Sequence, residues 1–147
     1  MNEQVETLLD KAVQNINIAK TIYYSELIAD EAYFNYVGYH LQQAVELSMK
    51  YLLEKNGVEY SKTHSIEQLI KLGNESNIDL HITEYIDNKA EMFSSWESQT
   101  RYIISYKLEK RKVSQALTEV ENYLVRIIDN ENSMNEENNQ SEGPVLG

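Results

Sequence analysis

The sequence predicts an all-α fold, an up-and-down antiparallel helical bundle of about five helices. The 147-residue chain contains one proline and five glycines, and only three of these glycines precede residue 143. A β-rich domain needs more tight turns than this, because such turns are built from Gly, Pro and Asn-Gly pairs. Apolar residues also recur at steps of three and four along most of the chain, which is the period of an amphipathic helix.

The composition narrows the class of protein. Hydrophobic residues make up 41% and charged residues 25% of the chain, which is typical of a folded domain. The absence of cysteine excludes disulfides, cysteine-based zinc sites and a thiolate nucleophile. The apolar runs are too short to span a bilayer, and residues 1–11 do not resemble a signal peptide. We therefore expect a soluble, cytoplasmic protein that does not associate with membranes.

Two long helices are expected in the first part of the chain. The first covers about residues 3–27 and the second about residues 31–55, since both carry a continuous apolar stripe. The very short link near Asp30 predicts that they form an antiparallel hairpin. Asn56 and Gly57 end the second helix, with Gly57 as a left-handed cap.

Two shorter helices follow. Ser65 begins the first of them, because Ser65 and Gln68 have the spacing of a capping box, and Gly73 ends it. The next helix begins between Asp79 and Thr83, and its pattern becomes ambiguous over residues 97–106, where we expect a break or turn.

A third long helix covers about residues 108–128, where apolar residues again repeat at helical spacing. The segment after it, residues 130–147, is polar, acidic and aperiodic, and is predicted to be a disordered tail. The bundle is therefore expected to occupy residues 1–129 as one domain.

The net charge of −11 argues against nonspecific nucleic-acid binding by the whole surface. Residues 129–147 contribute −5, so the preceding part of the chain carries −6. One basic segment stands out, because it holds five of the 13 Lys and Arg residues. These residues are Arg101, Lys107, Lys110, Arg111 and Lys112. The segment is either a solvated turn and helix start or a surface that contacts phosphate.

The second helix holds the densest group of polar residues: His40, Gln42, Gln43, Glu46 and Lys50. Glu46 and Lys50 have the spacing of a surface ion pair. Gln43 and Lys50 share one side of the helix, and His40 is predicted to lie on the same side. His40 is either a hydrogen-bonded boundary residue or a group of a functional site.

The other histidines give no metal-binding pattern. His64 follows Thr63 at the start of a predicted helix and either tethers the loop or joins the polar residues of the second helix, because the intervening loop is short. His81 stands alone and is assigned no role. The three histidines lack the spacings of common metal sites, so neither a metal nor another cofactor is expected.

Arg101 is the strongest single candidate for binding an anion. It is predicted to lie between two helices, where its guanidinium could hold a phosphate through two hydrogen bonds. Alternatively it pairs with Glu97, four residues earlier. The sequence contains no glycine-rich phosphate loop and no nucleophile elbow.

Three of these motifs together resemble the HEPN domain family (higher eukaryotes and prokaryotes nucleotide-binding domain). They are Tyr39 to Lys50 (YHLQQAVELSMK), the Thr63-His64-Ser65 turn after Gly57, and Thr100-Arg101-Tyr102. The resemblance covers about residues 5–128. It implies a compact helical bundle, often homodimeric, and many members act with a small nucleotidyltransferase as toxin and antitoxin.

The resemblance also implies a function. The ribonuclease branch of the family uses an Arg-x4-6-His motif without a metal. This chain has no His after Arg101, and Tyr106 stands where the His would follow four intervening residues. A phenol is a poor base at neutral pH. We therefore expect a non-catalytic nucleotide- or RNA-binding module that acts as a homodimer or with a nucleotidyltransferase-type partner. The expected nucleotide- or phosphate-binding residues are Arg101, Tyr102, Lys50, His40, Gln43 and His64.

Two other functions remain open at this point. One is a metal-independent ribonuclease toxin with a diverged site formed by Arg101 and Tyr106. The other is a structural bundle that binds a partner protein through its apolar stripes.

Overall fold

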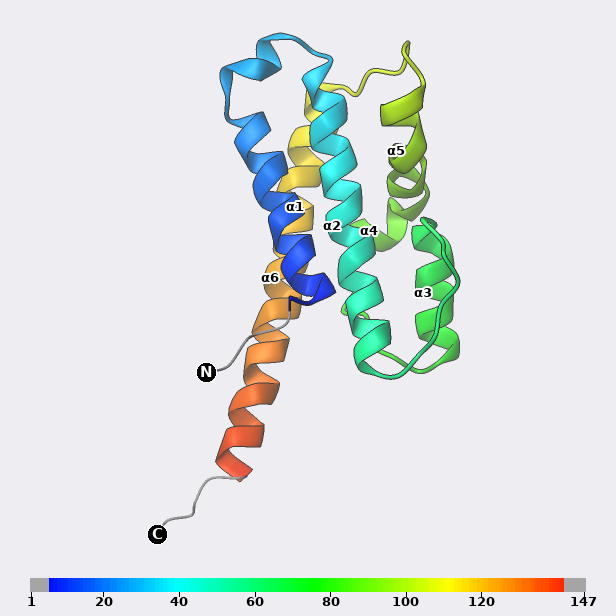
Figure 1. Ribbon diagram of the computed structural model, residues 1–147, viewed down its shortest axis with the longest axis vertical. Helices are drawn as coiled ribbons and strands as arrows, with labels where there is room; N and C mark the ends of the chain where they lie inside the picture. The colour runs from blue at the N-terminus through cyan, green and yellow to red at the C-terminus, as the bar shows by residue number, and fades with distance from the viewer. Residues whose placement is uncertain (1–5, 142–147) are drawn as a thin grey trace.

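The computed structural model describes the backbone of residues 6–141 and the side chains of residues 6–135. Within this part the chain forms helices and no strand, so the predicted all-α fold is confirmed (Figure 1). In chain order the elements are α1 (Leu8–Tyr23), the 3₁₀ helix η1 (Glu26–Ala29), α2 (Tyr33–Lys55), α3 (Ile66–Glu75), α4 (Glu84–Asn88), α5 (Ala90–Tyr102) and α6 (Lys110–Ser141). None of these described helices has the length and hydropathy needed to cross a bilayer.

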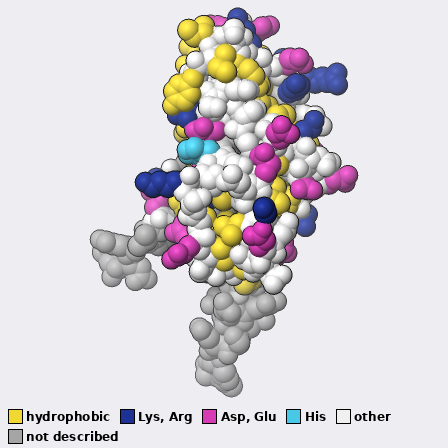
Figure 2. Space-filling model, turned by 90° about the vertical axis from the view of Figure 1, so that its right-hand side faces the viewer, with side chains coloured by type: hydrophobic (Ala, Val, Ile, Leu, Met, Phe, Trp, Pro, Cys, Tyr) yellow, Lys and Arg dark blue, Asp and Glu magenta, His cyan; other side chains and the backbone are white. Residues whose placement is uncertain are grey.

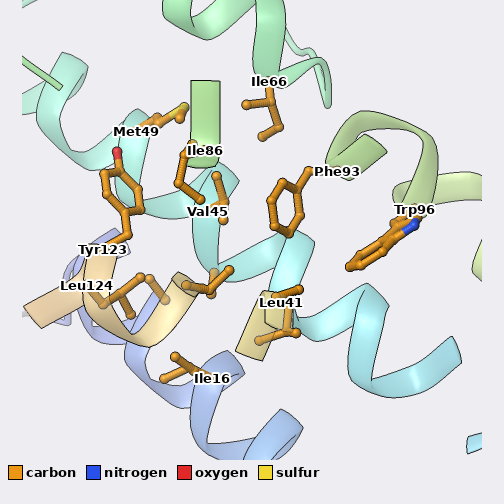
Figure 3. Packing of buried hydrophobic residues seen from close by; sticks show 14 of the residues in the cluster. Ile16, Leu41, Val45, Met49, Ile66, Ile86, Phe93, Trp96, Tyr123 and Leu124 are labelled. Carbon is orange, nitrogen blue, oxygen red and sulfur yellow. The ribbon is translucent and has the colours of Figure 1, made fainter. Parts of the chain in front are cut away.

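Helix α2 is the centre of the bundle and contacts α1, α3, α5 and α6. Figure 1 shows α1 antiparallel to α2 and α6 behind this pair, with α3 and α5 along the other side of α2. The core follows the apolar faces of these helices (Figure 3), and its largest buried side chains include Leu41, Met49, Ile66, Ile86, Phe93, Trp96 and Tyr123. Because α2 contributes core residues toward several neighbours at once, it sets the positions of the elements around it.

The first helix is shorter than predicted. It begins after Thr7, whose hydroxyl accepts a hydrogen bond from the Asp10 amide, and it ends at Tyr23 rather than near Leu27. Ser25 causes the early end, because its hydroxyl accepts from the Leu27 amide and so starts η1. The link between the two antiparallel helices therefore includes a 3₁₀ turn and is longer than expected.

The glycine of α3 has a different role from the predicted one. Ser65 caps the helix as expected, accepting a hydrogen bond from the Gln68 amide at 3.2 Å. Gly73 does not end the helix, which continues to Glu75. A Cβ on Gly73 would lie 2.7 Å from Cδ1 of Leu80, so this glycine gives room for the chain that returns past α3.

The predicted fourth helix is two helices. Thr83 caps α4 by accepting from the Ile86 amide, and the helical path is interrupted at Lys89 before α5 begins. The expected break within residues 97–106 falls late in that range, because α5 continues to Tyr102. Arg101 consequently lies in the last turn of α5 and not in a loop.

The last helix is longer than predicted. It continues past Ile128 to Ser141, so the expected end of this helix near Ile128 was wrong. Glu131 accounts for part of this, since its carboxylate accepts hydrogen bonds from the Tyr51 hydroxyl at 2.8 Å and from Lys55 Nζ at 2.6 Å. Residues 142–147 lie outside the described residues, and the domain boundary at 129 stays a prediction.

Asn35 fixes the turn between α5 and α6. Its side-chain amide donates to the Tyr106 carbonyl at 2.6 Å, and its side-chain oxygen accepts from the Leu108 amide at 2.9 Å. Both hydrogen bonds satisfy backbone groups that lie outside any helix and would otherwise need water as their partner. The start of α2 therefore holds the segment that follows Arg101.

Gly38 allows the closest approach of this segment to α2. A Cβ at this position would lie 2.2 Å from Cδ1 of Leu108 and 3.3 Å from Cε3 of Trp96. The missing side chain thus lets Leu108 and Trp96 cover the first half of α2.

We predict that Gly38→Ala lowers the free energy of unfolding by about 1–2 kcal/mol, because the forced displacement of Leu108 outweighs the better helix propensity of alanine. Urea unfolding measures this. In a Leu108→Ala background the same substitution should cost little, and an equal cost in both backgrounds would contradict the packing explanation.

Candidate functional site

The buried carboxylate of Glu46 organises the polar residues of α2. Glu46 is 2% exposed, and it accepts hydrogen bonds from Gln42 Nε2 at 2.9 Å and from Lys50 Nζ at 3.0 Å. The predicted surface ion pair with Lys50 exists but is largely buried, because Tyr60 and His64 from the chain after α2 lie against Lys50 and Glu46. A charge taken out of water is tolerated only when hydrogen bonds compensate it, and here they do.

His64 joins Glu46 to helix α5. Its Nδ1 lies 3.0 Å from Glu46 Oε1 and donates to it, since a carboxylate only accepts. Its Nε2 lies 3.7 Å from Oε1 of Glu97 on α5. The imidazole itself is largely exposed, with 59% of the side chain accessible. The two interpretations of His64 are thus compatible. The imidazole tethers its loop to Glu46, and it does so next to Glu97, the partner of Arg101.

Arg101 is held on three sides. Its Nη2 donates to Glu97 Oε1, the same oxygen that faces His64, and its Nε donates to the Glu97 carbonyl at 2.8 Å. The guanidinium carbon lies 4.9 Å from the ring centre of Tyr39 and 4.7 Å from that of Tyr102, which are cation–π distances. Nη1 donates no hydrogen bond within the described residues, so part of the guanidinium remains available to an anion.

The other two expected residues of α2 lie along the same network. Gln43 donates from Nε2 to Oε1 of Gln42 at 2.7 Å, which links it to Glu46. Lys50 lies 5.4 Å from the ring centre of Tyr60 in the loop before α3. Burial raises the pKa of Tyr60 to about 12, and the hydrogen bond to Glu54 adds to the shift, so this ring stays a neutral phenol beside the ammonium group.

Two candidates do not join the network. His40 faces α1, where its Nδ1 lies 2.8 Å from Oδ1 of Asn15, and burial lowers the pKa of this imidazole, which favours its neutral form. His40 therefore bonds to α1 and has no hydrogen bond to Gln43 or Glu46 among the described residues. The Tyr106 ring packs against the core, and among the described residues its hydroxyl makes no hydrogen bond to Arg101, whose partners are on Glu97.

The basic segment is exposed and unpaired apart from Arg101. Lys107, Lys110, Arg111 and Lys112 are exposed, and none has an ion-pair partner among residues 6–135. Three of them occupy the first turn of α6, which has no acidic residue, although the helix dipole disfavours cations at this end. An anion bound there would relieve that repulsion.

Exposed apolar side chains gather at the same end of the bundle. Tyr102 is 69% and Ile104 98% exposed, and Ile103 and Tyr36 are also exposed. We call the end formed by η1, the start of α2 and residues 103–109 the α5–α6 end. Figure 2 views the side that carries α3 and α5; it shows a histidine between acidic and basic side chains, with apolar side chains at the end above them.

Sequence reasoning missed two residues of this arrangement. Tyr39 lies four residues before Gln43 and seven before Glu46, and this spacing already put its ring on the same face of α2. Glu97 was considered only as a partner of Arg101, because nothing local to α5 shows that His64 approaches it from another part of the chain. In the described residues no three His, Asp or Glu side chains lie close enough together to hold a metal ion.

We predict that Glu46→Ala lowers the free energy of unfolding by about 3–5 kcal/mol, because it leaves Lys50 and Gln42 without their shared acceptor in a buried place. Glu75→Ala is the matched control, since Glu75 and Lys71 form an exposed pair of the same spacing at 3.9 Å. That change should cost about 0.5 kcal/mol or less. Equal costs in urea unfolding would contradict the role given to Glu46.

Comparison with known proteins supplies one match. No curated protein and no solved structure matches the chain. A family model described as HEPN domain matches residues 5–129. The matched range covers most of the chain and contains the whole network from Tyr39 to Tyr102, and the resemblance noted in the sequence is thereby confirmed. The chain belongs to the HEPN domain family.

Proposed function

We propose that the protein is a nucleotide- or RNA-binding module without catalytic activity, and that Arg101 and Tyr102 make the central contacts. Family membership supports a nucleotide- or RNA-related role in general. The observation that carries the proposal is the partly exposed guanidinium of Arg101, which lies against the rings of Tyr39 and Tyr102. Arg101 and Tyr102 suit different parts of a nucleotide, since a guanidinium binds phosphate and an exposed aromatic ring stacks on a base.

The charge distribution supports a ligand with more than one phosphate. Lys107, Lys110, Arg111 and Lys112 add four exposed cations to the segment that runs from Arg101 to the first turn of α6. Each phosphate neutralised by such a cation releases counterions, so binding must weaken as salt is added. Lys50, Gln43 and His64 border the same surface through Glu46 and Glu97, and we propose that they contact the ligand further from Arg101. His40 has no part in this contact surface.

The ribonuclease alternative is retained on one observation. Tyr106 packs against the core, but His64 and Arg101 contact the same Glu97 oxygen, and Glu46 orients the imidazole. An imidazole oriented by a buried carboxylate is a known form of general base. If the protein cleaves RNA, His64 rather than Tyr106 is therefore the residue that takes the proton.

We further propose that the protein acts as a homodimer or with a nucleotidyltransferase-type partner, and that the α5–α6 end forms the contact. Ile104 is 98% exposed, and burial of an apolar side chain of this size is favourable relative to its exposure to water. Burial of Ile103, Ile104 and Tyr36 against another chain would recover it.

The first prediction of this proposal concerns Arg101. Arg101→Ala should weaken binding of a short fluorescein-labelled single-stranded RNA by at least about tenfold, because charge-assisted hydrogen bonds to phosphate contribute about 1.5–3 kcal/mol. Fluorescence anisotropy measures the affinity.

Arg126→Ala is the matched control for this experiment, since Arg126 is an exposed arginine of α6 and its loss changes the net charge equally. Equal weakening in both variants, or no binding by the wild type, would exclude the proposed site. If the labelled RNA is shortened and His64→Ala prevents this, the ribonuclease function replaces the proposal. If the protein is instead a structural bundle that binds only a partner protein, the labelled RNA should stay unbound.

The second prediction concerns assembly. Sedimentation of the wild type should give the mass of a dimer, or of a complex when the nucleotidyltransferase-type partner is present. Ile104→Asp should reduce the measured mass to that of the monomer, because the introduced carboxylate would be buried at the interface without a partner. Val125→Asp on α6 is the control, since Val125 is half exposed away from this end. A dimer that survives Ile104→Asp would place the contact elsewhere.

A further inference from the structure

Glu97 is placed as a competitor for any anion that approaches Arg101. One carboxylate oxygen, Glu97 Oε1, accepts from Arg101 Nη2 and also faces His64 Nε2 at 3.7 Å. A phosphate that binds both terminal nitrogens of the guanidinium needs the position that this oxygen holds. The ligand-free protein therefore carries its own anion in part of the Arg101 site.

The protonation state of His64 decides how strongly Glu97 is drawn away. Because Nδ1–H donates to Glu46, a neutral imidazole turns the lone pair of Nε2 toward Glu97 Oε1. Two electron-rich atoms repel each other, so the carboxylate then stays with Arg101. A doubly protonated imidazole presents an N–H and a positive charge to the same oxygen and competes with Arg101 for it.

The charged groups around His64 support this exchange. Helix α2 presents Glu46, which Lys50 neutralises from its other oxygen at 3.0 Å, and α5 presents Glu97, which Arg101 neutralises. Lys62 and Tyr60 precede His64 in its own loop, and Glu67 follows it on α3, where its carboxylate is engaged by Ser94 on α5. Both carboxylates that contact His64 are thus shared with a cation, and the one on α5 is the less buried of the two.

We propose that Glu97 and His64 form a pH-sensitive gate on Arg101: protonation of His64 draws Glu97 from the guanidinium and opens it to phosphate. This proposal rests on the proposed function, because it concerns the same arginine. It assigns a regulatory role to Glu97, which is not among the proposed ligand contacts, and adds such a role to the contact proposed for His64.

The gate predicts a pattern over three variants, measured by anisotropy with the labelled RNA at pH 6 and pH 8. The wild type should bind more tightly at pH 6 by about two- to fivefold, the range expected for release of a partly exposed ion pair. Glu97→Gln should bind at pH 8 as tightly as the wild type does at pH 6, because the competing charge is gone. His64→Gln should bind weakly at both values and lose the pH dependence.

His81→Gln is the matched control, since His81 lies 3.4 Å from Asp79 in another part of the chain and is removed from the gate. It should keep the wild-type pH dependence. If Glu97→Gln binds no tighter than the wild type at pH 8, or if His64→Gln keeps the full pH dependence, the gate is wrong.

A measurement without RNA separates failure of the gate from failure of the proposed function. The side-chain Nε–H signal of Arg101, assigned by its loss in Arg101→Lys, should shift with pH in NMR spectra of the wild type and stay constant in His64→Gln. A pH-dependent signal without RNA binding would overturn the proposed function and leave the gate intact. A constant signal with Arg101-dependent RNA binding would overturn the gate alone.

Discussion

The arrangement of this molecule depends on one buried carboxylate. Glu46 lies in the middle of the central helix, where almost no water reaches it, and a charge in that place is stable only if donors surround it. Two donors, Gln42 and Lys50, come from the same helix, but the third, His64, comes from the loop that returns after α2. The need to satisfy Glu46 therefore fixes where this loop runs and where α3 begins. Since His64 then reaches Glu97, the same requirement extends to α5 and to Arg101.

This dependence connects stability and function through shared atoms. The groups proposed to contact a ligand are also those that hold α2, the loop and α5 together, so a substitution at Glu46 or His64 acts on both. Arg101 differs, because its contacts are with exposed or half-buried groups on one end of the bundle. A variant of Arg101 therefore reports on the ligand with little effect on the fold, whereas a variant of Glu46 reports first on the fold. Experiments on the family's motif residues need this distinction, since loss of binding has a different cause in each case.

The fold could be predicted from the sequence to the level of its helices, because apolar spacing is a local property. The errors arose where a distant residue decides the outcome: Gly73 continues its helix because Leu80 needs the space, and α6 runs past Ile128 where Glu131 contacts Tyr51 and Lys55. The site could be predicted as far as residues on one helix face, such as Gln43, Glu46 and Lys50. The sharing of Glu97 by His64 and Arg101 could not, since the two partners come from elements whose packing is set by the whole core. The hydrogen bond between His40 and Asn15 on α1 could not be predicted for the same reason.

The distribution of charge also limits what kind of polyanion the proposed site accepts. The chain carries a net charge of −11, yet Lys107, Lys110, Arg111 and Lys112 have no ion-pair partner among residues 6–135, whereas Arg101 pairs with Glu97. At physiological salt a charge is screened over about 8 Å, so a phosphate in the first turn of α6 experiences mainly Lys110, Arg111 and Lys112. A phosphate further along an extended strand leaves that range and meets the acidic remainder of the surface. Each added nucleotide beyond the basic end thus contributes repulsion instead of attraction, and the proposed site favours a short nucleotide ligand, an RNA end or a loop over a long continuous strand.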